Sequence, residues 1–191
     1  MSQKTYHHGD LRLALIEKGI ELIYQGGIQA LSLRKAAAAC GVSHAAPYAH
    51  FKSKDALLEA IGSHIAAKFA NALKMVAGEP SIEGLVNIGW AYVLFFSQHP
   101  HYYDFIFIRG NVKVGEKPYE PYDFFRQYMI SVFEKIRYPK EKWQTAIIAQ
   151  WALFHGLASL AVIEKDSNHV TWESRVREIL TKKYIITIEG Y

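Results

Sequence analysis

The stretch from Leu31 to Phe51, LSLRKAAAACGVSHAAPYAHF, constrains the fold of this chain more than any other. It predicts two short helices joined by a glycine turn and followed by an aromatic residue. Ser32 can cap the first helix, and Gly41 permits the positive φ that such a corner often requires. Ser43 can cap the second helix, because its hydroxyl can accept a hydrogen bond from an unpaired backbone amide. A helix-turn-helix of this kind places its second helix in the major groove of DNA, so the stretch indicates DNA binding.

The predicted interior of this motif is small and apolar: Leu33, Ala36, Ala37 and Cys40 on the first helix, and Phe51 after the second. Cys40 leaves two interpretations open. It can pack as a small apolar residue, which is the commoner role at such a place, or its thiol can sense oxidants.

Pro47 limits the second helix, because a proline deep in a helix removes a backbone hydrogen bond and clashes with the preceding turn. Either the helix begins near Ser43 or its first turn is distorted. In both cases residues 43–48 form an N-terminal turn, which is the part of such a motif that approaches base edges.

Polar and small side chains on this turn suit a DNA surface. His44 is the best candidate for contact with a base edge, and the methyl groups of Ala45 and Ala46 allow close approach or contact with a thymine methyl. Tyr48 and His50 are better interpreted as phosphate contacts, although the Tyr48 ring can be half-buried with its hydroxyl at the surface.

The helix that follows starts near Lys54, where the side chain and the free backbone amides can bind a phosphate together. Ser32 and Arg34 can do the same from the first motif helix. Ser32 and Ser43 are expected to act as caps whether or not they touch DNA.

The residues of this region resemble the DNA-binding domain of the TetR family of transcriptional regulators. The resemblance rests on YHHGDLR at residues 6–12 and on ALSLRKAAAACGVSHAAPYAHFKSKDALLEAI at residues 30–61. A cap with Arg34, a Gly-Val-Ser turn, an aromatic-x-His-Phe ending and a lysine opening the next helix follow in the family's order. Ala49 departs from the pattern, since many relatives carry a basic residue there.

The resemblance implies that residues 7–9 form an arm that contacts the DNA backbone. The full predicted set of DNA-binding residues is His7, His8, Gly9, Ser32, Arg34, Ser43, His44, Ala45, Ala46, Pro47, Tyr48, His50 and Lys54.

Charge is distributed in keeping with this prediction. The net charge is only +4, yet residues 1–70 hold eight lysines and arginines against five acidic residues, and five of the nine histidines. Ordinary scatter of surface charge would explain the bias equally well. A phosphate-binding face would use it to attract DNA in a salt-dependent way.

The composition indicates a soluble cytoplasmic protein. The single cysteine excludes an internal disulfide and fits a reducing compartment. We expect no export signal, because MSQKTYHHGD has no apolar core, and no membrane span, because no long uninterrupted apolar run occurs.

Helical periodicity runs through the chain and predicts an all-α fold, with a three-helix DNA-binding domain followed by a helical ligand-binding and dimerisation domain. We expect the first domain at residues 1–55, a linking helix at 53–77 and the second domain at 78–191, with the boundary at the Gly78–Pro80 cluster. The predicted helices are 11–24, 53–76, 82–98, 101–108, 122–137, 140–164 and 171–184, and the terminal KYIITIEGY can be frayed or extended.

Residues 90–128 contain 13 of the 26 aromatic residues. Most must form a helical core, but pockets for small molecules are also mainly apolar and aromatic. The resemblance implies an effector-binding domain here, and tyrosine hydroxyls, His155 or Gln150 could orient the effector. The predicted ligand-binding residues are Trp90, Phe95, Tyr102, Tyr103, Phe125, Tyr128, Trp151 and His155.

WALFHGLASLAVIE at residues 151–164 is similar to a TetR subgroup marked by an aromatic-His-Gly element, here Phe154-His155-Gly156. Small residues on this helix would let another helix approach, so the last two helices could pair with their copies in a second chain as a four-helix interface. Gly156 is either a dimer contact or a residue that fills a gap within the subunit. A two-fold dimer suits DNA, because it reads two half-sites about one helical turn apart.

An enzyme is the main alternative class, but no nucleophile motif, glycine-rich phosphate loop or carboxylate pair occurs. His7-His8 and His99-x-His101 are weak as metal ligands. We therefore expect no catalytic residue, metal or cofactor. A binding module that has lost DNA affinity is a second alternative. The favoured prediction is a homodimeric regulator, most commonly a repressor in this family, that binds a palindromic operator and is released by a small apolar or aromatic effector.

Overall fold

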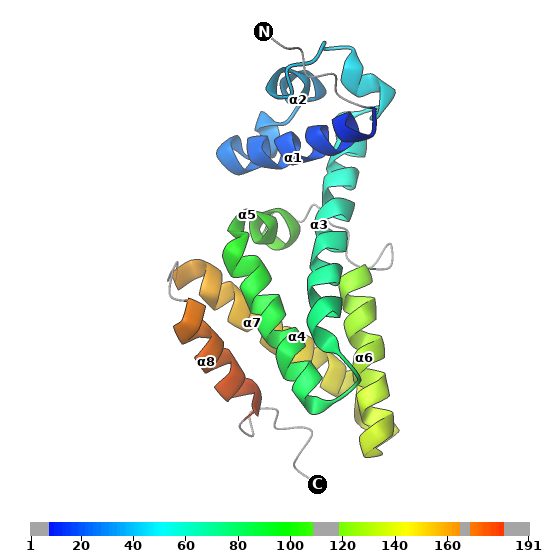
Figure 1. Ribbon diagram of the computed structural model, residues 1–191, viewed down its shortest axis with the longest axis vertical. Helices are drawn as coiled ribbons and strands as arrows, with labels where there is room; N and C mark the ends of the chain where they lie inside the picture. Colours follow the sequence, from blue (N-terminus) through cyan, green and yellow to red (C-terminus); the bar gives the residue numbers. More distant parts are fainter. Residues whose placement is uncertain (1–7, 109–118, 165–168, 182–191) are drawn as a thin grey trace. The chain divides into compact units, whose positions relative to one another are not determined.

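The computed structural model describes residues 8–108, 119–164 and 169–181. Within these ranges every regular element is a helix and no strand occurs (Figure 1). The predicted all-α fold is therefore confirmed.

Internal contacts divide the chain into two compact units: residues 1–65 with 104–113, and residues 66–103 with 114–191. The predicted boundary at Gly78–Pro80 is the turn between α3 (Lys54–Ala77) and α4 (Ile82–Gln98). The division between the units lies within α3, because the buried residues of its first half belong to the first unit and those of its second half to the second.

The first unit is built on α1 (His8–Gly26), whose apolar residues recur every three or four positions. Leu15, Ile16 and Ile23 are at most 3% exposed, so this helix buries the predicted stripe. After α1 the described elements of this unit are η1 (Ile28–Ala30), α2 (Leu33–Ala39), η2 (Ala46–Ala49), the first half of α3, and the π-helical η3 (Asp104–Ile108).

α2 starts at its predicted cap, since the Ser32 hydroxyl accepts a hydrogen bond from the Lys35 backbone amide at 3.1 Å. Gly41 has a φ of 68°, the left-handed conformation predicted for the corner. Cys40 is only partly buried, so its prediction as an inward-facing residue is wrong; α2 ends at Ala39 and Cys40 already lies at the corner. Burial raises the pKa of the Cys40 thiol, which disfavours the reactive thiolate.

The second helix of the motif is shorter than predicted. The Ala46 amide donates to the Ser43 carbonyl at 3.0 Å, and only Ala46–Ala49 form a helix, a single 3-10 turn without a side-chain cap. The prediction that Ser43 caps a helix is therefore wrong. Pro47 gives the reason, because it has no N–H to donate and sits in the first turn. Of the two alternatives that this proline allowed, the distorted turn is the one that forms.

Phe51 closes the first unit as predicted. It is 3% exposed, and the Arg12 guanidinium lies over its ring, 5.3 Å from the centroid. α3 begins just afterwards, where the Ser53 hydroxyl accepts a hydrogen bond from the Ala56 amide at 3.1 Å. The predicted cap of this helix is therefore confirmed.

α4 packs in the second unit against α7 (Trp143–Glu164) and α8 (His169–Thr181). Its bounds match the predicted helix, and the Ser81 hydroxyl caps it. Gly89 lets these helices approach closely, because a Cβ at this position would collide with the side chains of Phe154 and Leu180. The remaining elements are α5 (Pro100–Tyr103), α6 (Glu120–Ile136) and η4 (Lys140–Lys142).

α6 ends at Ile136, one residue before its predicted end, because Arg137 adopts a left-handed conformation with a φ of 56°. Two predictions fall outside the described residues. They are most of the Gly-, Pro- and Lys-rich loop, at residues 109–118, and the terminal stretch KYIITIEGY.

By length and composition, residues 140–164 would suffice to cross a membrane, with a mean hydropathy of 1.8 over the most apolar window. The helix nevertheless packs against α4 and α6, with Ala146, Ile147 and Phe154 in the core. Only 39% of that window is buried, so α7 keeps a large apolar surface that its own subunit does not cover.

Candidate functional site

The outward face of the helix-turn-helix carries most of the residues predicted to bind DNA. Arg34, His44 and Ala45 are exposed, and the Tyr48 side chain is 54% exposed. Tyr48 is thus a surface residue, with the ring as well as the hydroxyl accessible. His7 lies outside the described residues, while His8 and Gly9 open α1 and only their backbone is described.

Two predicted contacts lie beneath this face. Pro47 is buried, so its prediction as a DNA contact is wrong; its ring packs inward and shapes the turn. His50 is half-buried, and its Nε2 atom is shielded from solvent without a hydrogen-bond partner. The base-facing part of the turn is therefore confined to the exposed residues 43–45 and Tyr48.

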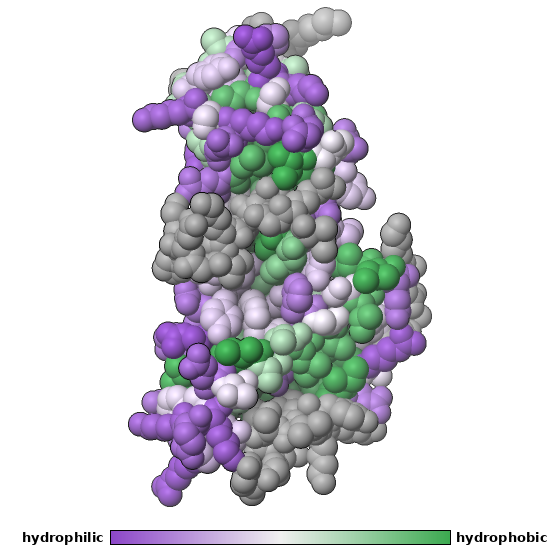
Figure 2. Space-filling model, turned by 180° about the vertical axis from the view of Figure 1, so that it is seen from behind, coloured by the Kyte–Doolittle hydropathy of each residue, from purple (hydrophilic) through white to green (hydrophobic). Residues whose placement is uncertain are grey.

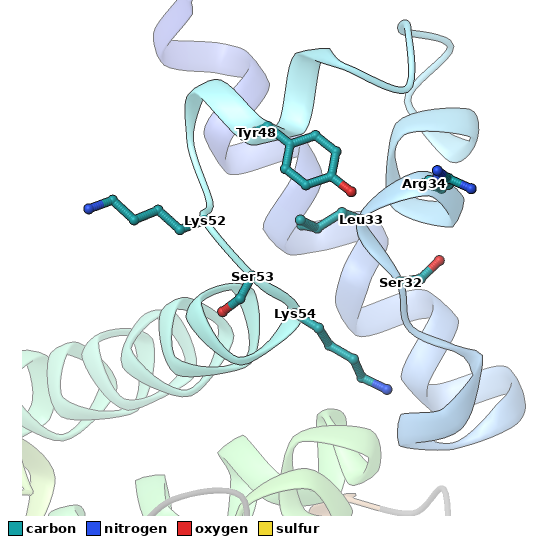
Figure 3. A pocket seen from close by; sticks show the side chains of 7 residues that line it. All are labelled: Ser32, Leu33, Arg34, Tyr48, Lys52, Ser53 and Lys54. Atoms are coloured by element: carbon teal, nitrogen blue, oxygen red, sulfur yellow. The ribbon is translucent and has the colours of Figure 1, made fainter.

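A shallow cavity of about 370 Å³ opens on the first unit between α2, η2 and the start of α3. Figure 3 shows the Tyr48 ring standing between Arg34 and Lys52. The cavity is lined by Ser32, Leu33, Arg34, Tyr48, Lys52, Ser53 and Lys54. Three of these side chains are cationic, two are serines and none is acidic, which is the chemistry that binds the phosphates of DNA.

Lys54 is held inside its own subunit. Its Nζ atom donates a hydrogen bond to the Ile28 carbonyl at 2.7 Å, in a partly buried position. In Figure 3 its side chain extends away from Tyr48. The ammonium predicted to clamp a phosphate therefore joins the start of α3 to η1, and only its remaining N–H groups could reach DNA.

Sequence reasoning missed Lys52. This side chain is exposed on the same cavity, and no ion pair involving it occurs among the described residues. The available signal was the Lys-Ser-Lys sequence at residues 52–54, in which a lysine stands on each side of the capping serine. Position relative to the helix start favoured Lys54, whereas the path of the chain before the cap places Lys52 on the surface.

The second unit contains a histidine held between two tyrosines. The Tyr92 hydroxyl is hydrogen-bonded to Nδ1 of His155 and the Tyr103 hydroxyl to Nε2, both at 3.2 Å. The Tyr103 and His155 rings also stack, with centroids 5.4 Å apart. Burial lowers the pKa of His155, so the ring is neutral near pH 7, and one nitrogen donates while the other accepts.

Aromatic side chains surround this group and join several predicted ligand-binding residues. The Trp151 ring lies 5.0 Å from Tyr92, 5.1 Å from Phe125 and 5.3 Å from Tyr122. The Phe95 ring lies 5.8 Å from that of Tyr102. We call the set Phe69, Tyr92, Phe95, Phe96, Tyr102, Tyr103, Tyr122, Phe125, Trp151, Phe154 and His155 the aromatic cluster; ring contacts connect its members.

Tyr128 and Trp90 do not join the aromatic cluster as predicted. The Tyr128 hydroxyl lies 2.7 Å from the Ala77 carbonyl and 2.8 Å from the Glu79 carbonyl, and it stabilises the turn between α3 and α4. Its prediction as a ligand-orienting group is therefore wrong. Trp90 is half-buried and lies two residues before Tyr92, which places it about 200° around the helix from that residue.

An exposed apolar stripe runs along α7. Ile148 is 52%, Leu160 51% and Ile163 71% exposed. Gly156 lies on the same side, and a Cβ added to it would meet no atom of the described residues within 4 Å. Gly156 therefore fills no gap within the subunit. Figure 2 shows hydrophobic side chains gathered on the side of the second unit from which α7 is seen.

Comparison with known proteins agrees with this arrangement. Residues 15–61 match the family model of the bacterial regulatory proteins of the tetR family. No curated protein matches the sequence. The all-helical fold and its helix-turn-helix define a DNA-binding regulator rather than an enzyme. The chain is a member of the TetR family of transcriptional regulators.

Solved structures share the fold over nearly the whole chain. A protein of unknown function from Rhodococcus sp. RHA1 is 23% identical, with a TM-score of 0.74 over 93% of this chain and 97% of that one. A TetR-like transcriptional regulator from the same organism is 14% identical, with a TM-score of 0.68 over 92% and 96%. The regulator FadR from Bacillus subtilis, in complex with stearoyl-CoA, is 14% identical, with a TM-score of 0.67 over 89% and 97%.

Proposed function

We propose that this protein is a repressor that binds a palindromic operator as a homodimer in the cytoplasm and is released by a small apolar or aromatic effector. The observation that carries the proposal is the cationic cavity beside the exposed turn at residues 43–45, within the segment that matches the family. Phosphate contacts supply the affinity and hold the turn against base edges.

Sequence preference comes from a small surface. His44 is exposed at the tip of the turn and can donate or accept a hydrogen bond, while Ala45 beside it can contact a thymine methyl. The 3-10 turn that follows is too short to lay a long helix along the groove. We therefore infer that each subunit reads few bases directly and that much of the affinity is independent of sequence.

The exposed stripe of α7 supports a homodimer. Its apolar side chains lie on one side of the helix and would lose their contact with water against a second copy. Gly156, with open space around it, lets the partner helix approach closely. α8 packs beside α4 in the same unit and completes a four-helix interface together with α7. Two subunits then present two turns to successive major grooves.

The aromatic cluster supports an effector site. It combines apolar rings with a few hydrogen-bonding groups, as sites for small molecules do. The FadR structure with stearoyl-CoA shows a ligand bound to a protein of this fold. We infer that an effector bound here changes the separation of the two DNA-reading turns, so that the dimer no longer fits its operator.

Footprinting of the purified protein on the DNA that flanks its own gene tests the proposal. We expect a protected palindrome, with binding that weakens steeply as salt rises. Compounds are then screened for release of the protein from that site, with stearoyl-CoA included as one probe. A chain that protects no site and retains no salt-dependent affinity would be a degenerate module, and the proposal would be rejected.

A further inference from the structure

Two polar groups are buried in the second unit without any hydrogen-bond partner. Gln150 is 6% exposed and its Nε2 atom is unpaired, and Tyr119 is 8% exposed and its hydroxyl is unpaired. Buried polar atoms in proteins are nearly always paired, because an unpaired one loses its hydrogen bonds to water and gains none. Neither group stabilises the ligand-free chain, so each calls for a partner from outside the chain.

Both groups lie beside the aromatic cluster. Gln150 directly precedes Trp151 on α7, and the Trp151 ring packs on Tyr92. Tyr119 is near Tyr92 as well, since burial first, and then the charges that Tyr119 and Tyr103 would carry, raise the pKa of Tyr92. The unpaired amide and the unpaired hydroxyl therefore flank the same part of the unit, where His155 also makes its hydrogen bonds.

The chemistry of these groups selects the missing partner. Nε2 of a glutamine only donates hydrogen bonds, and a tyrosine hydroxyl that lacks a partner can donate one as well. Among the described residues of the second unit, no lysine, arginine, aspartate or glutamate is buried. A charged ligand would lose its hydration there without meeting an opposite charge, which is unfavourable by a large margin.

Resting on the proposed effector site, we propose that the effector is an uncharged molecule with an aromatic body and a hydrogen-bond acceptor, such as a ketone carbonyl, that accepts from Gln150 and Tyr119. The aromatic cluster packs on the body of the ligand, and the two donors select the acceptor. A site built to hydrogen-bond a ligand rejects an analogue without the bonding group, because its buried donors then stay unpaired.

Three probes of matched shape test this assignment: benzophenone, diphenylmethane and diphenylacetate. The first carries a carbonyl, the second replaces it by a methylene group, and the third carries a carboxylate. Binding to the full chain is measured by thermal shift and by isothermal titration, with no DNA present. We expect benzophenone to bind at least about tenfold more tightly than either of the others.

Gln150→Met and Tyr119→Phe remove the unpaired groups and keep the side-chain volume nearly constant. We expect each variant to melt at a higher temperature than the wild type without ligand, and to lose the preference for benzophenone over diphenylmethane. Tyr128→Phe is the matched control. Its hydroxyl is paired in the turn between α3 and α4, so this variant melts at a lower temperature and keeps the preference.

Tighter binding of diphenylacetate, or no preference of the wild type for benzophenone over diphenylmethane, would overturn the assignment, and so would the absence of binding by all three probes. The same holds if both variants kept the wild-type preference. These results leave the regulator itself intact, because operator binding is measured separately by gel shift. A protein that binds benzophenone with the expected preference but protects no operator would reject the proposed function and retain the ligand assignment.

Discussion

The ammonium of Lys54 donates a hydrogen bond to the backbone carbonyl of Ile28, 2.7 Å away and 26 residues earlier in the chain. This bond joins the first turn of α3 to η1, on the far side of the chain from Tyr48 in Figure 3. It separates two lysines that the sequence alone presents as near equivalents. Lys52 lines the cavity with its charge exposed, while Lys54 lines it with its charge engaged.

Replacing these two lysines should therefore give different results. Lys52→Ala should weaken binding to every DNA sequence and reduce the slope of log affinity against log salt by about 1, with no change in melting temperature. Lys54→Ala should lower the stability by about 1 kcal/mol, because the Ile28 carbonyl loses its donor. Salt-dependent DNA titration and thermal unfolding of both variants measure the difference. Equal melting temperatures for the two variants would contradict the role assigned to Lys54.

His44→Ala should remove the preference among operators and leave non-specific binding nearly unchanged. The side chain is exposed, so the folded state does not depend on it. Competition between the operator and variants with single base-pair changes should show relaxed selection at one position in each half-site. The assignment fails if the variant discriminates as the wild type does.

Leu160→Asp should convert the proposed dimer to a monomer while the subunit stays folded. Leu160 is 51% exposed on α7, so the charge meets water in the monomer but a hydrophobic surface in a dimer. Operator affinity should fall at least about a hundredfold, because the second half-site is no longer bound by a linked subunit. Sedimentation measures the mass. Met75→Asp, on α3 at 87% exposure, is the control and should leave the mass unchanged.

Tyr128→Phe should destabilise the chain by about 1–3 kcal/mol, because the carbonyls of Ala77 and Glu79 lose their donor in a buried turn. The effect is read from chemical denaturation. Tyr122→Phe is a useful comparison, since the Tyr122 ring packs on Trp151 and the substitution preserves this contact. A Tyr128 variant as stable as the wild type would show that the turn does not need the hydroxyl.

Stability should also fall as the pH is lowered from 7 towards 5. Burial lowers the pKa of His155 below its ordinary value, so in this range the unfolded chain binds more protons than the folded one. Burial lowers the pKa of His99 and His101 in the same direction, so these residues add to the loss. His155→Gln should therefore show a shallower dependence of melting temperature on pH than the wild type. A dependence as steep as that of the wild type would assign the loss to other groups.

Much of the first unit follows from local rules that a sequence displays. Ser32 and Ser53 cap their helices and Gly41 takes a positive φ, because hydroxyl reach and the absence of a Cβ act over a few residues. Pro47 likewise indicated a distorted turn. Its extent was not predictable, since the reduction to one 3-10 turn depends on how Pro47 packs against the rest of the unit.

The sequence by itself determined the helical class, the position of the helix-turn-helix and the apolar character of α7, because these depend on spacing and on the chemistry of single residues. Only the tertiary structure decided which lysine faces outward, that the Tyr128 hydroxyl belongs to a turn, and that His155 lies between two tyrosines. Each of these relationships joins residues between 26 and 63 positions apart. A side chain's partner at such a separation is set by how whole helices pack, and no local pattern records it.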